Sequence, residues 1–264
     1  MLIAQITDLH VMPKGKLAYE RVDTAAMLRN AVAHLNRLAP RPDVVLVTGD
    51  LADKGEPLAY QNLREILAGL QLPYYVIPGN HDKHAAFREA FQDHTYIPAG
   101  GDFIQYVIDD HPIRIVAADS VVPGQTQGML CEQRLAWLDK VLGERPGVPT
   151  LVLMHHPPLA TGLQHYDEVG MARIPELEAV ISRHPQVERI LCGHVHRAIQ
   201  TRFGGTLVSA CPSTAHQVFC DLRPNGQDAW SLDPPGFQLH RWNGKALFSY
   251  TLNVGEFDGP HPFH

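Results

Sequence analysis

Short apolar runs alternate with segments of helical periodicity along most of the chain. Runs without a polar interruption are typical of strands that are buried on both faces of a sheet. The predicted strands are residues 2–7, 44–47, 74–77, 150–154 and 187–191. The predicted helices are residues 24–38, 57–70, 84–91, 132–142 and 174–182. This alternation favours an α/β fold.

Two regions depart from the alternation. Residues 103–108 and 113–117 flank a polar turn and are predicted to form an antiparallel hairpin. From residue 206 onward the pattern predicts only strands and turns, separated by prolines. We therefore divide the chain into a catalytic domain at 1–205 and a β-rich extension at 206–264.

The composition of the chain argues against several classes of protein. The chain has 264 residues, 45% of them hydrophobic and 19% charged, which excludes a disordered protein. A net charge of −6 argues against general nucleic-acid binding, because phosphate contacts need clustered lysine and arginine. No apolar run is long enough to cross a bilayer, and no targeting segment is visible. Its four cysteines show no metal or redox spacing, so we expect a reduced, cytoplasmic protein.

Aspartate, asparagine or histidine residues, whose side chains can bind metals or take part in catalysis, follow each of the five predicted buried strands. These strand ends read Asp8-Leu9-His10, Gly49-Asp50, Gly79-Asn80-His81-Asp82, His155-His156-Pro157-Pro158 and Cys192-Gly193-His194-Val195-His196. In a mostly parallel sheet such ends lie along one edge, where ligands bind. A single histidine or Gly-Asp there is most often a turn residue, but five in series are hard to explain as turns.

Metal binding explains the series best. Several carboxylates and imidazoles packed together are costly to desolvate, and a pair of divalent cations removes that cost. Mixed imidazole and carboxylate donors suit Zn, Fe, Mn or Co better than Ca or Mg. With Asp50 as the bridge, the donors divide into two groups: Asp8, His10 and His196 for one ion, and Asn80, His155 and His194 for the other. Two metals can activate a bridging hydroxide for in-line attack at phosphorus.

This series of motifs resembles the calcineurin-like binuclear metallophosphoesterase superfamily. Its G-N-H-D form, together with residues 234–242 near the end, is most similar to the class III cyclic-nucleotide phosphodiesterases and the bacterial glycerophosphodiesterases. The resemblance covers nearly the whole chain. It implies a four-layer α/β/β/α sandwich with a small β-rich C-terminal extension that caps the site and helps to form a homo-oligomer, as a dimer or a dimer-based assembly.

The resemblance also implies roles for individual residues. The metal ligands would be Asp8, His10, Asp50, Asn80, His155, His194 and His196. His81 would be the catalytic histidine that contacts the phosphate, and we favour charge stabilisation over acid catalysis. Asn80, His81 and His216 would contact the substrate. His156 is expected to orient its neighbours. Asp53 and Asp119 are candidate partners of the ligands, but we interpret them as surface-turn residues.

The implied activity is metal-dependent hydrolysis of small organic phosphodiesters, either cyclic nucleotides or glycerophosphodiesters. No sequence pattern assigns Tyr19, Tyr166 or Phe219 to a base pocket, so the choice between these substrates stays open. A phosphomonoesterase and a broad phosphodiesterase or phosphonate esterase are the enzymatic alternatives. A non-catalytic scaffold would be expected to lack ligand residues, whereas all seven positions hold competent donors. A nuclease is disfavoured by the acidic charge balance.

Overall fold

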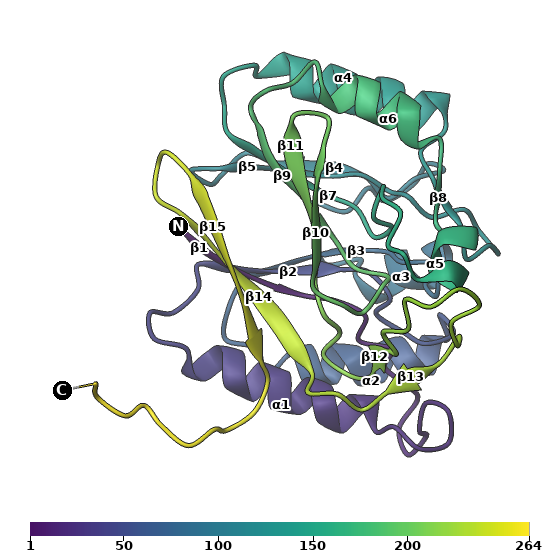
Figure 1. Cartoon of the computed structure of the whole chain (residues 1–264), viewed down its shortest axis with the longest axis vertical. Helices are drawn as coiled ribbons and strands as arrows, with labels where there is room; N and C mark the ends of the chain where they lie inside the picture. Colours follow the sequence, from purple (N-terminus) through teal and green to yellow (C-terminus); the bar gives the residue numbers. More distant parts are fainter. Residues whose placement is uncertain (264) are drawn as a thin grey trace.

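The computed structural model describes residues 1–263 and arranges them in four layers (Figure 1). Two sheets pack face to face, and helices cover the outer face of each. The first sheet has five strands in the order β15-β14-β1-β2-β3, and the second has six in the order β10-β11-β9-β7-β5-β4. Figure 1 shows α1 and α2 outside one sheet and α4 and α6 outside the other. The predicted α/β/β/α sandwich is therefore confirmed.

The elements follow the hydrophobic pattern closely. The helices are α1 (Thr24–Arg37), α2 (Pro57–Leu67), α3 (His84–Ala90), α4 (Glu132–Glu144), α5 (Gln164–Glu168) and α6 (Ile174–Ile181). The strands of the first sheet are β1 (Leu2–Ile6), β2 (Val44–Thr48), β3 (Tyr74–Ile77), β14 (Gly236–Trp242) and β15 (Leu247–Asn253). Those of the second are β4 (Tyr106–Ile108), β5 (Arg114–Ala117), β7 (Thr150–Leu153), β9 (Val187–Cys192), β10 (Ile199–Phe203) and β11 (Thr206–Ala210). Two small pairs, β6 (Gly128–Met129) with β8 (Met171–Ala172) and β12 (Gln217–Val218) with β13 (Trp230–Ser231), were not predicted.

Apolar side chains fill all three spaces between the layers. One cluster joins α1, α2 and α3 to the first sheet, and another joins α4 and α6 to the second. A third lies between the sheets, where β2 is buried along its whole length. This middle layer also holds a polar group, in which His240 contacts Gln5 Oε1 at 3.0 Å and Ser249 Oγ at 2.6 Å. Since both faces of each sheet are covered, the strands read as continuous apolar runs.

The segment after residue 205 completes both sheets. Strand β11 pairs with β9 in the second sheet, and β14 pairs antiparallel with β1 in the first. Every element from Thr206 to residue 263 is a strand, as the pattern predicts. The predicted boundary at 205 falls within the β10–β11 hairpin. The role of this segment as a cap or oligomerisation element stays a prediction.

Two further observations bear on the sequence predictions. Across residues 1–263, no helix combines the length and apolar character needed to span a membrane. All four cysteines are free thiols, and Cys192 and Cys211 are buried.

Candidate metal centre and active site

The strand ends that carry the predicted ligands come from two different sheets and meet in space. Strands β1, β2 and β3 run parallel in the first sheet, and β7 and β9 run parallel in the second. The carboxyl ends of both sets meet at one end of the sandwich, where the pocket-lining residues include side chains from each. The expectation that the five ends share a single sheet edge is therefore wrong, because the chain splits them between two sheets that face each other.

The first group of predicted ligands surrounds the end of β1. Nε2 of His10 and Nε2 of His196 lie 3.1 Å apart, and Nε2 of His196 lies 3.3 Å from Oδ1 of Asp8. Oδ2 of Asp50 lies 3.7 Å from Nε2 of His10. Ring nitrogens that approach a carboxylate and each other this closely converge on a single point, as ligands of one cation do.

The second group shares Asp50 with the first. Nε2 of His155 lies 3.3 Å from Oδ2 of Asp50 and 3.1 Å from Oδ1 of Asn80. Nδ1 of His194 lies 3.0 Å from the same Asn80 oxygen. The other ring nitrogen of His155 donates to the Thr48 carbonyl at 2.9 Å, which leaves Nε2 free to face the cluster. Asp50 thus lies between the two groups, where the sequence analysis placed a bridging carboxylate.

Unusual backbone conformations position these side chains. Five of the seven predicted ligands have φ between 44° and 71°, the left-handed region that residues other than glycine rarely adopt: Asp8, His10, Asp50, His194 and His196. The glycines of the motifs allow close approach. A Cβ at Gly49 would lie 2.3 Å from Nδ1 of His155, and a Cβ at Gly79 would lie 2.2 Å from Oδ1 of Asp50. These two motif glycines are needed because any side chain would collide with a ligand.

The electrostatics of the cluster fit bound cations. Asp8 and Asp50 are 0% and 2% exposed, and within the described chain their ion-pair partners are all imidazoles. Burial raises the pKa of the Asp50 carboxyl, but His155, His81 and His10 together outweigh it and hold that pKa well below its usual value. In turn, burial lowers the pKa of His155, but the Asp50 carboxylate raises it to about 9. Nε2 of His194 is buried without a hydrogen-bond partner. Buried carboxylates without lysine or arginine, beside an unpaired ring nitrogen, are the donor set that divalent ions require.

His81 lies at the edge of the cluster with its ring partly exposed. Its backbone N–H donates to Oδ1 of Asp50 at 2.9 Å, and its Nδ1 donates to the Asp53 carbonyl. Nε2 is therefore the nitrogen that faces the pocket, 4.0 Å from Oδ2 of Asp50. Burial lowers the pKa of His81, but Asp50, the Asp53 carbonyl and carboxylate, and Asp82 together outweigh it, and the net shift is upward. In its protonated form the ring can donate from Nε2 into the pocket.

Asp53 is a partner of the ligands rather than a surface-turn residue. Its Oδ1 lies 3.2 Å from Nδ1 of His10, while its backbone carbonyl fixes His81. Contacts of this kind orient a metal-binding histidine and raise its basicity. The turn interpretation of Asp119 is also wrong, because Asp119 is buried and accepts hydrogen bonds from the backbones of Ile104 and Val121.

Asp82, the last residue of G-N-H-D, joins the loops that follow β2 and β3. Its Oδ2 accepts from the backbone N–H groups of Leu51 at 3.0 Å and Gly79 at 2.8 Å. Its Oδ1 accepts from Ala52 N–H at 3.2 Å and from the Tyr60 hydroxyl at 2.6 Å. Burial and the nearby Asp50 raise the pKa of Asp82 to about 6. This carboxylate therefore fixes Asp50 relative to Asn80.

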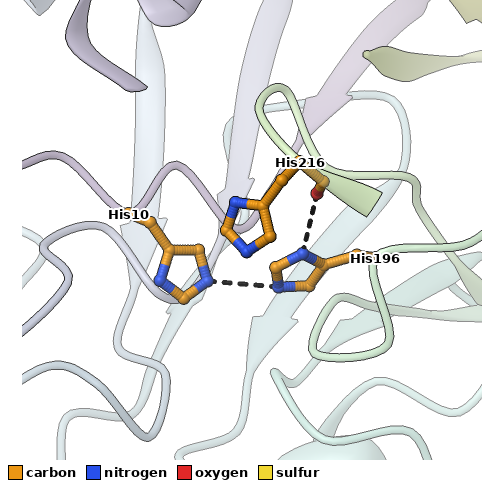
Figure 2. A group of neighbouring side chains, drawn as sticks. All are labelled: His10, His196 and His216. Atoms are coloured by element: carbon orange, nitrogen blue, oxygen red, sulfur yellow. Dashed lines mark hydrogen bonds between the residues drawn. The ribbon is translucent and has the colours of Figure 1, made fainter. Parts of the chain in front are cut away.

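His216 lies beside the first group of ligands (Figure 2). Its backbone carbonyl accepts from Nδ1 of His196 at 2.9 Å, which aims Nε2 of His196 at His10. The His216 ring lies 4.7 Å from that of His196 and 5.2 Å from that of His10, centroid to centroid. Its Nδ1 is buried without a partner. The structure thus brings the predicted substrate-contacting histidine into the pocket.

His156 lies beside the predicted ligands His155 and His194, but its ring nitrogens contact other groups. Its Nδ1 lies 2.8 Å from Ser120 Oγ, and its Nε2 donates to the Thr126 carbonyl at 3.0 Å. Both ring nitrogens are occupied, while the ring packs 4.7 Å from that of His194. This agrees with the expected orienting role.

The cluster forms the floor of a cavity of about 380 Å³. Its walls include aromatic residues that no sequence motif singled out. The rings of Tyr19 and Trp230 stack at 5.2 Å and 23°, and Tyr166 packs at 5.4 Å from the ring of His194. Asp228 also lines the cavity. Tyr19, Tyr166 and Trp230 lie far apart in the chain, in the loop before α1, in α5 and in β13, and only tertiary packing brings them together.

Comparison with known proteins places this geometry among phosphoesterases. A family model described as calcineurin-like phosphoesterase matches residues 1–198. The probable glycerophosphodiester phosphodiesterase GpdQ of Arcobacter nitrofigilis is 38% identical, covering 100% of this chain and 97% of its own. The 3′,5′-cyclic AMP phosphodiesterase CpdA of Escherichia coli K12 is 34% identical over 81% of this chain and 76% of its own. A dimetal phosphatase structure from Danio rerio shares the fold, with a TM-score of 0.65 and 15% identity over 97% of this chain and 99% of that one.

Proposed function

The chain belongs to the calcineurin-like phosphoesterase family, and from this premise we propose that it is a metal-dependent hydrolase of small organic phosphodiesters. One observation carries the proposal: a buried carboxylate, Asp50, lies between two groups of donors that each converge on a point. Asp8, His10 and His196 would complete one cation site. Asn80, His155 and His194 would complete the other.

The donor set favours Fe, Mn, Zn or Co, because it mixes imidazole nitrogen with carboxylate and amide oxygen. When bound, two such ions supply Lewis acidity at phosphoryl oxygens and make water more acidic near neutral pH. Asp53 supports this chemistry by holding the ring of His10 through its Nδ1.

His81 supplies the donor that the phosphoryl group needs. Its Nδ1 is committed to the Asp53 carbonyl, so its Nε2 faces the pocket, and the protonated ring would donate from Nε2 to a non-bridging oxygen as negative charge develops there. The nearby carboxylates of Asp50, Asp53 and Asp82 raise the pKa of His81, which favours the protonated ring. We assign His81 to charge stabilisation. Asn80 and His216 face the same cavity and would contact the substrate.

Glycerophosphodiesters are the substrate group that we favour over cyclic nucleotides. Two relatives with glycerophosphodiester phosphodiesterase in their names match 98–100% of this chain, and their identities are 34–38%. Relatives with cyclic-nucleotide or cyclic AMP phosphodiesterase in their names match 81–92% of it, and their identities are 29–38%. The support therefore extends through the C-terminal strands as well as the motif region.

The test compares a model diester with a model monoester. Metal-stripped protein is reconstituted with Mn(II), Zn(II) or Co(II) and assayed on bis(p-nitrophenyl) phosphate and on p-nitrophenyl phosphate. We expect metal-dependent turnover with a clear preference for the diester. A preference for the monoester would instead support a phosphomonoesterase, and no turnover with any metal would contradict the proposal.

We also propose that the chain forms a homo-oligomer through β15. This strand is the edge of the first sheet, and it carries the exposed row Phe248, Tyr250 and Leu252. Antiparallel pairing of β15 with a second copy, centred on Tyr250, would place Phe248 opposite Leu252 and extend the sheet across the interface. Light scattering should report a dimer or a multiple of one. Tyr250→Arg should yield monomers, whereas a wild-type monomer at all concentrations would contradict the proposal.

A further inference from the structure

The space between the two sheets contains polar side chains at the end where the metal centre lies. One of them is Gln5, which projects from β1 and is 0% exposed. Its Nε2 donates to Thr48 Oγ1 at 2.9 Å and to the backbone carbonyl of Cys192 at 3.0 Å. Its Oε1 accepts from Nε2 of His240 at 3.0 Å. Both N–H groups and the oxygen of this amide are therefore hydrogen-bonded, as a buried amide requires.

The partners of Gln5 allow only one orientation of its amide. The Cys192 carbonyl can only accept, so the amide nitrogen faces it and the amide oxygen faces His240. Burial, together with Arg189, lowers the pKa of His240 to about 3, so its ring is neutral at pH 7 and its single proton is on Nε2. Nδ1 of His240 then accepts from the Ser249 hydroxyl at 2.6 Å, and Ser249 Oγ accepts from Nη1 of Arg189 at 2.6 Å. These side chains hold the glutamine amide in place.

The two acceptors of the Gln5 amide end strands of different sheets. Thr48 is the last residue of β2, and its own carbonyl accepts from Nδ1 of His155 at 2.9 Å. Cys192 is the last residue of β9 and lies two positions before the predicted ligand His194. One amide thus joins the strand end that holds His155 to the strand end that carries His194.

The second predicted cation site draws its ligands from both sheets. Asn80 follows β3 of the first sheet, whereas His155 and His194 follow β7 and β9 of the second. We propose that Gln5 is a positioning residue for this site: by joining the ends of β2 and β9, its amide fixes the two histidine ligands relative to Asn80. The inference rests on the proposed function and concerns a residue that acts through its two acceptors rather than on the substrate.

Gln238 offers a matched control in the same layer. It is also 0% exposed and lies opposite Gln5, on β14. Its Oε1 accepts from Ser209 Oγ at 3.0 Å, and its Nε2 donates to the Ala210 carbonyl at 3.3 Å and to Thr251 Oγ1 at 3.2 Å. Gln238 therefore joins the two sheets through β11, a strand that carries no predicted metal ligand.

The experiment titrates metal-stripped protein with Mn(II) and follows binding by calorimetry and by electron paramagnetic resonance. Gln5→Met keeps the length of the side chain but removes all three hydrogen bonds, and Gln238→Met does the same at the control position. Urea unfolding of the metal-free proteins should show a comparable loss of stability in both. Gln5→Met should also weaken binding of one of the two Mn(II) ions about 10- to 100-fold, so that at equal loading the spectrum shows isolated rather than coupled ions. Gln238→Met should keep both affinities within about twofold of wild type.

A milder pair of variants tests the same contact if Gln5→Met does not fold. Thr48→Val removes the hydroxyl that accepts from Gln5 and should weaken binding of the same Mn(II) ion about tenfold, whereas Thr48→Ser keeps the hydroxyl and should retain most of the affinity. Equal Mn(II) affinities in Gln5→Met and Gln238→Met, or in Thr48→Val and Thr48→Ser, would overturn the inference. Wild-type protein that binds fewer than two Mn(II) ions, or that does not turn over bis(p-nitrophenyl) phosphate, would instead contradict the proposed function itself.

Discussion

Replacing Asp82 tests how the loops of the candidate metal centre are held. In Asp82→Ala, the backbone N–H groups of Leu51, Ala52 and Gly79 and the Tyr60 hydroxyl lose their buried acceptor. An unsatisfied buried donor costs about 2 kcal/mol, so the four together cost about 8 kcal/mol. The variant also removes a buried charge. Because the pKa of Asp82 is raised from 3.8 to about 6, that charge destabilises the metal-free fold by about 3 kcal/mol at pH 7.

The net expectation for Asp82→Ala is therefore a loss of about 5 kcal/mol in the free energy of unfolding. Asp82→Asn is the matched control. Its amide oxygen can keep the contacts to Leu51 and Gly79, and it also removes the charge. The Tyr60 hydroxyl can rotate to accept from the new amide group, so only the Ala52 N–H loses its acceptor, at about 2 kcal/mol. The relieved charge offsets this cost, so Asp82→Asn should stay within about 1 kcal/mol of wild type.

The assay is urea unfolding of chelator-treated protein at pH 7, followed by circular dichroism. A titration of metal-stripped protein with Mn(II) accompanies it. Asp82→Ala should weaken metal affinity by about 10- to 100-fold, because the loops that carry Asp50 and Asn80 are no longer fixed relative to each other. If Asp82→Ala is as stable as wild type, or if Asp82→Asn is destabilised as much as Asp82→Ala, the reasoning is refuted.

Three further outcomes are expected. Asp50→Ala should abolish metal-dependent turnover, because both groups share this carboxylate; near-normal activity with two metals bound, counted by mass spectrometry, would contradict its bridging role. His81→Ala should keep its metals yet lose about 10²–10³ in kcat, the usual effect of one oxyanion donor, and an unchanged rate would assign it to structure. His240 has its pKa lowered to about 3 by burial and by Arg189, so it favours folding above pH 6.5 and opposes it as the pH falls towards 3. His240→Gln should therefore reduce the stability lost between pH 7.5 and pH 5 by about 2 kcal/mol in urea unfolding, and an identical loss would contradict this account.

The sequence predicted most elements because strands buried on both faces read as uninterrupted apolar runs. It also predicted that the candidate ligands would lie close together. Asp8 and His10, for example, lie two positions apart after a strand and project from the same strand end. It could not place Asp53, because a carboxylate after an apolar run has the same pattern in a surface turn and beside a histidine. The contact with Nδ1 of His10 depends on how the loops after β1 and β2 pack.

The aromatic side chains that line the active-site cavity could not be predicted from the sequence, for a related reason. Tyr19 lies in the loop before α1 and Trp230 in β13, and neither belongs to a periodic pattern. Their rings stack because the loop before α1 and the β12–β13 pair, which are distant in the chain, pack against each other. Similarly, no local signal could show that the five strand ends would be shared between two sheets, since the apolar run of β7 reads the same as that of β2.

The left-handed backbone at five of the predicted ligands has an evolutionary consequence. Each such residue destabilises the fold by about 1–2 kcal/mol, so together they cost about 5–10 kcal/mol, comparable to the whole net stability of a typical domain. The remaining layers of the sandwich must outweigh this strain before the protein can fold at all. A descendant that no longer needed cations could replace these residues with glycine and become more stable. Selection for catalysis, rather than for folding, therefore preserves this part of the chain.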